Sequence, residues 1–159
     1  MKKLAIIGLL VVVLTMINSG AVMAAPALHK ASGGGTNVGP DGAIRTVSFT
    51  AIQVSEAGDA KGQLEVLNRT QEVELHCSIL YLKVDGNQAW IGGVVTQSSD
   101  PIFRPVGWEF VLRVLDNGDG ANEAVDSSSY ISFGYRAIYA LSKPSVDMYA
   151  WPNGNIQVK

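Results

Sequence analysis

The sequence predicts an all-β protein, a single-domain antiparallel meander that forms a small barrel or a two-layer sandwich. Three observations support this fold class. Short runs of alternating apolar and polar residues recur after residue 43, as half-buried strands require. Glycine, proline, asparagine and aspartate cluster between these runs, where turns need them. After the first 25 residues no helical period lasts more than two turns.

The central element is a hairpin that extends from Glu72 to Thr96. Its two apolar runs meet at Asp85-Gly86-Asn87. Aspartate followed by glycine is a strong hairpin signal, because glycine accepts the positive φ that a tight turn needs. The apolar residues of the first run change phase after Ile79. This change predicts a β-bulge in a strongly coiled sheet or barrel.

Further strands are expected on both sides of the hairpin, at residues 44–54, 62–67, 106–114, 130–139 and 155–159. In the first of them, Val47 and Phe49 face one way and Arg45 faces the other. A second phase change then turns Ile52 and Val54 inward. The last strand is expected to return to the first one.

Aromatic residues fall in phase with apolar neighbours in two of these strands, which indicates that they belong to the core. Gly92 and Gly93, in the returning strand of the hairpin, thin the sheet where Trp108 or Tyr135 can lie over it. The in-phase aromatic residues are Trp108, Phe110, Phe133, Tyr135 and Tyr139.

Residues 1–24 have the pattern of a bacterial signal peptide. Lys2 and Lys3 precede an apolar run, and small residues around Ala24 form a cleavage site. The run is short for a transmembrane helix, so we expect no membrane span after leader cleavage. The expected location is secreted, periplasmic or the cell envelope. The chain then divides into a flexible leader at residues 25–42, rich in glycine and small residues, and a β domain at residues 43–159. Within the leader, the sequence leaves open that Thr36 to Val38 lie along a sheet edge.

Charge and cysteine content narrow the possible partners. The chain has 12 basic and 14 acidic residues, and the expected leader removes two of the basic ones. An acidic balance with interspersed charges argues against nucleic acid as a partner. Cys77 is the only cysteine, so no internal disulfide forms and the core alone holds the domain.

Several landmarks occur in a fixed order: SGGGT, VDGNQAWIGGVVT, VLDNGDGAN and a terminal GNIQV. In this order the chain resembles an uncharacterised family of secreted bacterial β-rich proteins. The resemblance covers most of the chain after the leader. It implies secretion and a single β domain, and it transfers no activity and no functional residues.

Residues with catalytic potential form no complete constellation in the sequence. His76 and Cys77 are adjacent in a strand and therefore point to opposite faces, so the imidazole does not activate the thiol. Cys77 is expected to be a buried apolar residue. Glu65, Glu74 and Glu109 are outward strand residues, and two of them in one cleft would make a hydrolase.

The loop after residue 115 is the candidate metal site. Calcium prefers oxygen ligands on flexible turns, although the glycines of this loop do not fit an EF-hand. Four residues are the candidate ligands: Asp116, Asp119, Glu123 and Asp126. No other cofactor is indicated.

Four aromatic residues without an obvious place in the core are candidate binding residues: Trp90, Phe103, Tyr149 and Trp151. Exposed aromatic rings at one end of a sheet bind apolar ligands, sugar faces or proteins. The sequence therefore favours a secreted, non-catalytic β domain that binds a small amphipathic ligand or a surface protein or glycan. The alternatives are a secreted hydrolase that uses a carboxylate pair and a structural component of the envelope.

Overall fold

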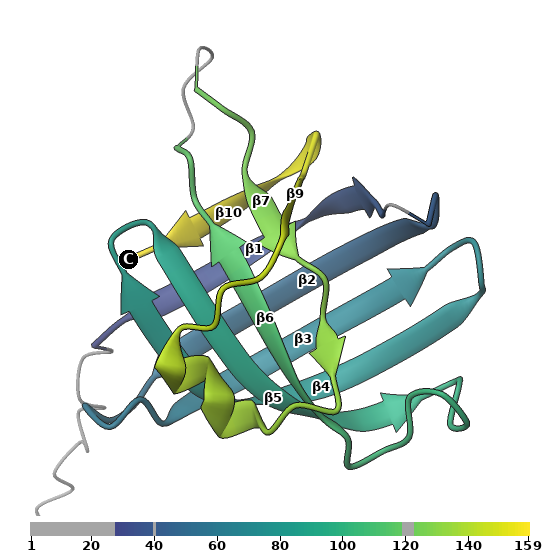
Figure 1. Ribbon diagram of the computed structural model, residues 1–159, viewed down its shortest axis with the longest axis horizontal. Coiled ribbons are helices and arrows are strands. Elements are labelled where there is room, and N and C mark those ends of the chain that lie inside the picture. Colours follow the sequence, from purple (N-terminus) through teal and green to yellow (C-terminus); the bar gives the residue numbers. More distant parts are fainter. Residues whose placement is uncertain (1–27, 40, 119–122) are drawn as a thin grey trace, which may run out of the picture.

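The computed structural model describes residues 28–39, 41–118 and 123–159. They form a single curled sheet, a half-barrel, with one short helix packed on it (Figure 1). The predicted signal peptide at residues 1–24 lies outside the described residues. Within the described part of the chain, no helix has the length and apolar character needed to cross a membrane. The elements are β1 (Lys30–Val38), β2 (Ile44–Gln53), β3 (Ala60–Asn68), β4 (Val73–Asp85), β5 (Gln88–Ser98), β6 (Glu109–Leu115), β7 (Ser127–Ser129), β8 (Ser132–Phe133), η1 (Ala137–Ser142), β9 (Met148–Ala150) and β10 (Asn153–Val158).

The strands are ordered β10-β1-β2-β3-β4-β5-β6-β7-β9, and β8 pairs with β6. All of these pairings are antiparallel. The predicted all-β meander is therefore confirmed, as one curled sheet. The central hairpin is confirmed as well, because β4 and β5 pair up to Asp85 and Gln88 and Gly86 has a φ of 59°. The register shifts between Ile79 and Tyr81, where the sequence predicts a bulge.

The first strand, β1, differs from the flexible leader predicted for residues 25–42. Residues 30–38 pair with β2 on one side and with β10 on the other. The glycines of this stretch let aromatic rings lie directly on the strand, since a Cβ atom on Gly33 would lie 3.0 Å from Cε1 of Phe49. Glycine here serves close packing, which composition alone does not distinguish from a linker.

The core fills the concave side of the sheet. Phe49 and Trp151 meet edge to face there, with ring centroids 6.4 Å apart. Cys77 is buried within this core, as predicted. Its other large, fully buried members include Leu64, Leu75, Leu82, Ile91, Phe110, Leu112 and Ile156.

The phase change predicted for the end of β2 is wrong. Gln53 continues the inward alternation and is buried, while Val54 is exposed. Nε2 of the buried Gln53 side chain donates to the Ser55 carbonyl oxygen at 2.7 Å, while its Oε1 has no hydrogen-bond partner among the described residues.

Two of the predicted strands are shorter than expected. β6 begins at Glu109, and Trp108 before it is 43% exposed, because Gly107 has a φ of 90° and interrupts the extended chain. The stretch at residues 130–139 contains only β8 and the start of η1, since Gly134 turns the chain with a φ of 85°. Tyr135 and Tyr139, predicted to be core, are consequently exposed.

The helix η1 covers the outer side of the hairpin. A Cβ atom on Gly92 would collide with the Ala137 carbonyl, so helix and strand touch backbone to backbone. Gly93 is instead covered by the Phe110 ring on the core side. The two glycines therefore do make room for neighbours, which are Ala137 and Phe110 rather than Trp108 or Tyr135.

Candidate functional site

One end of the half-barrel carries polar side chains on its inner face. Asn37 pairs with Arg45, and Arg45 pairs with Asn68, so the three residues form one row across β1, β2 and β3. Paired residues of neighbouring strands face the same side of a sheet. Arg45 is also in phase with buried Val47 and Phe49. The predicted outward orientation of Arg45 is therefore wrong.

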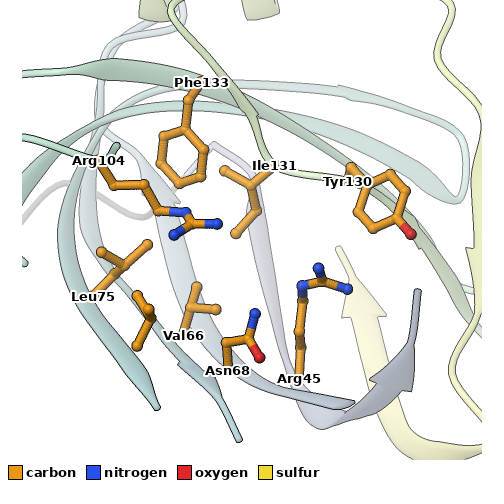
Figure 2. Close-up of a pocket in the computed structure, with 9 residues that line it drawn as sticks. Arg45, Val66, Asn68, Leu75, Arg104, Tyr130, Ile131 and Phe133 are labelled. Atoms are coloured by element: carbon orange, nitrogen blue, oxygen red, sulfur yellow. The ribbon is translucent and has the colours of Figure 1, made fainter. Parts of the chain in front are cut away.

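Beside this row lies a cavity of about 160 Å³, which Arg45 and Asn68 help to line and which we call the end cavity (Figure 2). Apolar side chains from β3, β4 and β8 form most of its wall, and the guanidinium group of Arg104 points into the space between them (Figure 2). The lining residues are Arg45, Val66, Asn68, Val73, Leu75, Arg104, Tyr130, Ile131 and Phe133.

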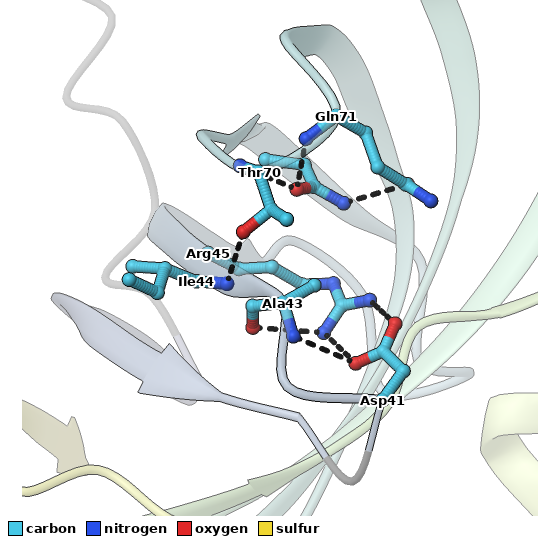
Figure 3. A network of polar contacts seen from close by, with 7 residues as sticks. Asp41, Ala43, Ile44, Arg45, Thr70 and Gln71 are labelled. Carbon is cyan, nitrogen blue, oxygen red and sulfur yellow. Dashed lines mark hydrogen bonds and ion pairs between the residues drawn. The ribbon is translucent and has the colours of Figure 1, made fainter.

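Arg45 is held rigidly at the rim of this cavity. Its Nη1 donates to Oδ1 of Asp41 at 3.0 Å, and its Nη2 donates to Oδ2 of the same carboxylate (Figure 3). The hydrogen bonds from Arg45 lower the pKa of Asp41 to about 2. The Arg45 guanidinium also lies 5.3 Å from the ring centroid of Tyr130. Arg45 is thus a fixed part of the cavity lining, and its guanidinium group is already paired with the Asp41 carboxylate.

The turn between β3 and β4 forms the neighbouring part of the rim. Oδ1 of Asn68 accepts hydrogen bonds from the backbone N–H groups of Thr70 and Gln71, each at 3.1 Å (Figure 3). Oγ1 of Thr70 in turn accepts the N–H of Ile44 at 3.0 Å and ties this turn to β2. The buried amide of Asn68 is therefore a structural group.

Arg104 differs from Arg45 because most of its donors are free. Its Nη1 donates to Oδ2 of Asp100 at 2.6 Å, while Nε and Nη2 have no hydrogen-bond partner among the described residues. The Arg104 side chain is 26% exposed. It also lines a wider cleft with Val73, Asp100 and Phe103, so Arg104 stands where the end cavity opens to the surface.

The four aromatic residues predicted to bind a ligand do not lie together. Trp151 is buried in the core, where its Nε1 donates to Oγ of Ser128 at 2.8 Å. Trp90 is buried beneath η1 and donates to the Pro144 carbonyl oxygen at 3.0 Å. Phe103 is 72% exposed at the cleft beside Arg104, and Tyr149 lines a separate groove near β9.

Two of the candidate calcium ligands, Asp116 and Asp126, accept hydrogen bonds from backbone N–H groups. Oδ2 of Asp116 accepts the N–H of Val158 at 2.9 Å, and Oδ2 of buried Asp126 accepts the N–H of Ile156. Both donors belong to the outer edge of β10. The two carboxylates therefore take the place of a neighbouring strand along this edge.

Of the other two candidate ligands, Glu123 is exposed and Asp119 lies outside the described residues. Among the residues whose positions are described, no group of three or more His, Cys, Asp or Glu side chains is arranged to hold a metal ion. Calcium binding by this loop stays a prediction.

The carboxylates considered for hydrolysis lie away from the end cavity. Glu65 and Glu74 flank His76 on the exposed side of β3 and β4, at 3.6 and 3.2 Å from its ring nitrogens. Glu109 accepts the N–H of Ala137 and pairs with Arg136, so it caps the start of η1.

Sequence patterns did not predict Arg45, Arg104 and Tyr130 as site residues. A signal was present for Arg45, because an arginine in phase with Val47 and Phe49 has to face the interior. For Arg104 no signal was present, since a loop of nine residues with two prolines has no periodicity.

No family model, characterised protein or solved structure matches this chain.

Proposed function

We propose that this protein is an exported, non-catalytic β domain that binds a small amphipathic anion in the end cavity. The ligand class is a carboxylate with a short apolar body. The observation that carries the proposal is the free guanidinium edge of Arg104 above an apolar wall. The signal-peptide pattern of residues 1–24 supports export.

Arg104 supplies the charge that the proposal needs. A guanidinium group binds a carboxylate through two parallel N–H donors, and such charge-assisted bonds are about twice as strong as neutral ones. Nε and Nη2 of Arg104 offer these two donors, while Asp100 fixes the group through Nη1 at 2.6 Å. Arg45 contributes less, because Asp41 already occupies its paired donors.

The cavity volume limits the apolar body of the ligand. About 160 Å³ is available, and an apolar protein cavity of about 150 Å³ holds one benzene molecule. Val66, Leu75 and Phe133 provide apolar contact on several sides. Benzoate and hexanoate are therefore suitable probes, whereas long acyl chains exceed the space.

The chemistry of the lining favours binding over turnover. The described side chains around the cavity offer two guanidinium groups, an amide and a phenol, with no carboxylate, imidazole or thiol to act as base or nucleophile. Glu65, Glu74 and Glu109, the residues of the hydrolase alternative, have other partners outside this cavity.

Calorimetric titration tests the proposal with benzoate, benzyl alcohol and benzylamine. We expect benzoate to bind, the alcohol to bind at least about tenfold more weakly because the charged hydrogen bonds are lost, and the amine not to bind. Arg104→Gln should remove the preference for the acid.

Arg136→Gln is the matched control, because Arg136 is also paired with a carboxylate but lies on the surface, with its side chain 82% exposed. It should leave benzoate affinity unchanged. Equal affinity for acid and alcohol, or equal effects of the two arginine substitutions, would contradict the proposal. Hexanoate serves as a second acid, with hexanol as its neutral partner.

A further inference from the structure

Two further pockets lie between the segments 129–139 and 144–149, next to β6. The chain passes from β7 through β8 to η1 and then returns to β9, which pairs with β7 (Figure 1). The two pockets have volumes of about 130 and 320 Å³ and share Ser132, Ser145 and Val146. We call these two adjoining pockets together the tyrosine trough, after the residues that line its two parts: Tyr135 and Tyr139, and Tyr130 and Tyr149.

Each part of the trough contains a pair of aromatic rings. The rings of Tyr135 and Tyr139 are nearly parallel, at 14°, with centroids 5.9 Å apart, and both residues are about half exposed. The rings of Tyr130 and Tyr149 have centroids 4.5 Å apart. Tyrosine combines a flat apolar face with a polar hydroxyl, which suits ligands that are apolar on one face and polar at the edge.

Polar groups without protein partners lie between these pairs. Within the described residues, the side chains of Ser132, Ser145 and Asp147 make no hydrogen bond, and all three line the trough. Ser129 differs, because its hydroxyl already accepts the N–H of Arg113 and donates to the Tyr130 carbonyl oxygen. The trough thus offers two hydroxyl groups and one carboxylate to a ligand.

We propose that the tyrosine trough binds a neutral oligosaccharide. A pyranose ring has a face of C–H groups, which packs on a tyrosine ring, and an edge of hydroxyl groups, which bond to serine and aspartate side chains. The carboxylate of Asp147 accepts sugar hydroxyls and disfavours acidic sugars. Two pockets that share three lining residues favour a chain of sugar rings over a single one, with the exposed rings of Tyr135 and Tyr139 as the stacking surface.

The tyrosine trough is a separate site from the end cavity, although Tyr130 lines both. The two ligands have different chemistry, one anionic and apolar and the other neutral and hydroxylated. Loss of sugar binding therefore leaves the end-cavity proposal intact, and the reverse also holds.

The test is titration of the full domain with cellotriose and chitotriose at millimolar concentration, followed by NMR chemical shifts. We expect at least one of the two to bind, with shifts confined to residues 129–149 and the facing part of β6. Tyr139→Ala should lower the affinity by about tenfold because one ring face is lost. Tyr139→Phe should keep most of it, and Tyr81→Ala, on β4 outside the trough, should have no effect.

Asp147→Ala provides a second variant whose folding is not in question, because this exposed side chain makes no hydrogen bond with the described protein. We expect it to weaken sugar binding, whereas Glu56→Ala, at an exposed carboxylate of another loop, should not. The proposal is overturned if neither trisaccharide binds, if the shifts map elsewhere, or if each trough variant matches its control.

Discussion

Gly35 lies directly beneath the indole ring of Trp151. A Cβ atom on Gly35 would stand 2.8 Å from Cε3 of that ring and 2.7 Å from the Asn153 carbonyl oxygen. The contact joins β1 to the chain entering β10, 116 positions away in sequence, and it places Gly35 against the buried Trp151 ring.

Gly35→Ala should therefore destabilise the fold by about 3 kcal/mol, since backbone atoms cannot move aside as a side chain can. Urea unfolding measures the effect. Gly34→Ala is the matched control, because its Cβ would meet nothing nearer than 3.8 Å and the expected change is within about 0.5 kcal/mol. Similar losses of unfolding free energy at both positions would show that Gly35 does not pack against the Trp151 ring.

Asp126→Ala should cost about 3 kcal/mol of stability, because two backbone donors, the N–H groups of Asn117 and Ile156, lose a charged acceptor. Chemical denaturation again gives the value. Asp147→Ala, at an exposed carboxylate, should change stability by less than about 0.5 kcal/mol. If Asp126 instead held calcium, adding calcium would raise the melting temperature of the native protein and not that of the variant.

Burial raises the pKa of the Cys77 thiol from 9.0 to about 12. A raised pKa means that the neutral thiol stabilises the fold fully below pH 9, and that this contribution is lost as the pH rises from 9 to 12. Unfolding free energies measured over this range should fall more steeply in the native protein than in Cys77→Ala, by up to about 4 kcal/mol at pH 12. Parallel curves would contradict the assignment.

The pKa of Asp41 is lowered, to about 2 from an ordinary 3.8, so its effect on the pH dependence of stability is opposite to that of Cys77. The ionised carboxylate stabilises the fold above pH 4, and this contribution is lost as the pH falls from about 4 to about 2. In the Asp41→Asn variant, the free energy of unfolding should therefore fall less steeply between about pH 4 and about pH 2 than in the native protein. NMR titration of the Asp41 carboxyl carbon checks the midpoint directly, and a midpoint near 3.8 would mean that Arg45 is not its partner in solution.

Local chemistry explains which elements were predictable from the sequence. The hairpin at Asp85-Gly86 depends only on neighbouring residues, because the turn needs a positive φ at Gly86. The bulge after Ile79 is equally visible, since it changes the phase of the apolar positions. The burial of Cys77 follows from the same alternation.

Contacts between distant segments explain the features that the sequence patterns did not predict. Nothing near Trp151 in sequence shows that β1 lies beneath it, so its burial could not be read from the chain. The backbone partners of Asp116 and Asp126 were equally hidden in the sequence, because only the position of β10 shows that these carboxylates accept its N–H groups. The end cavity was missed for a simpler reason, the wrong face given to Arg45.

Edge strands normally expose N–H groups that recruit a strand from another molecule. In β10 the carboxylates of Asp116 and Asp126 already occupy the N–H groups of Val158 and Ile156. A second chain that tried to extend the sheet there would have to displace two charge-assisted bonds and would meet negative charge. At its carboxyl-terminal strand the half-barrel thus resists edge-to-edge aggregation through two side-chain carboxylates, where other sheets place a further strand.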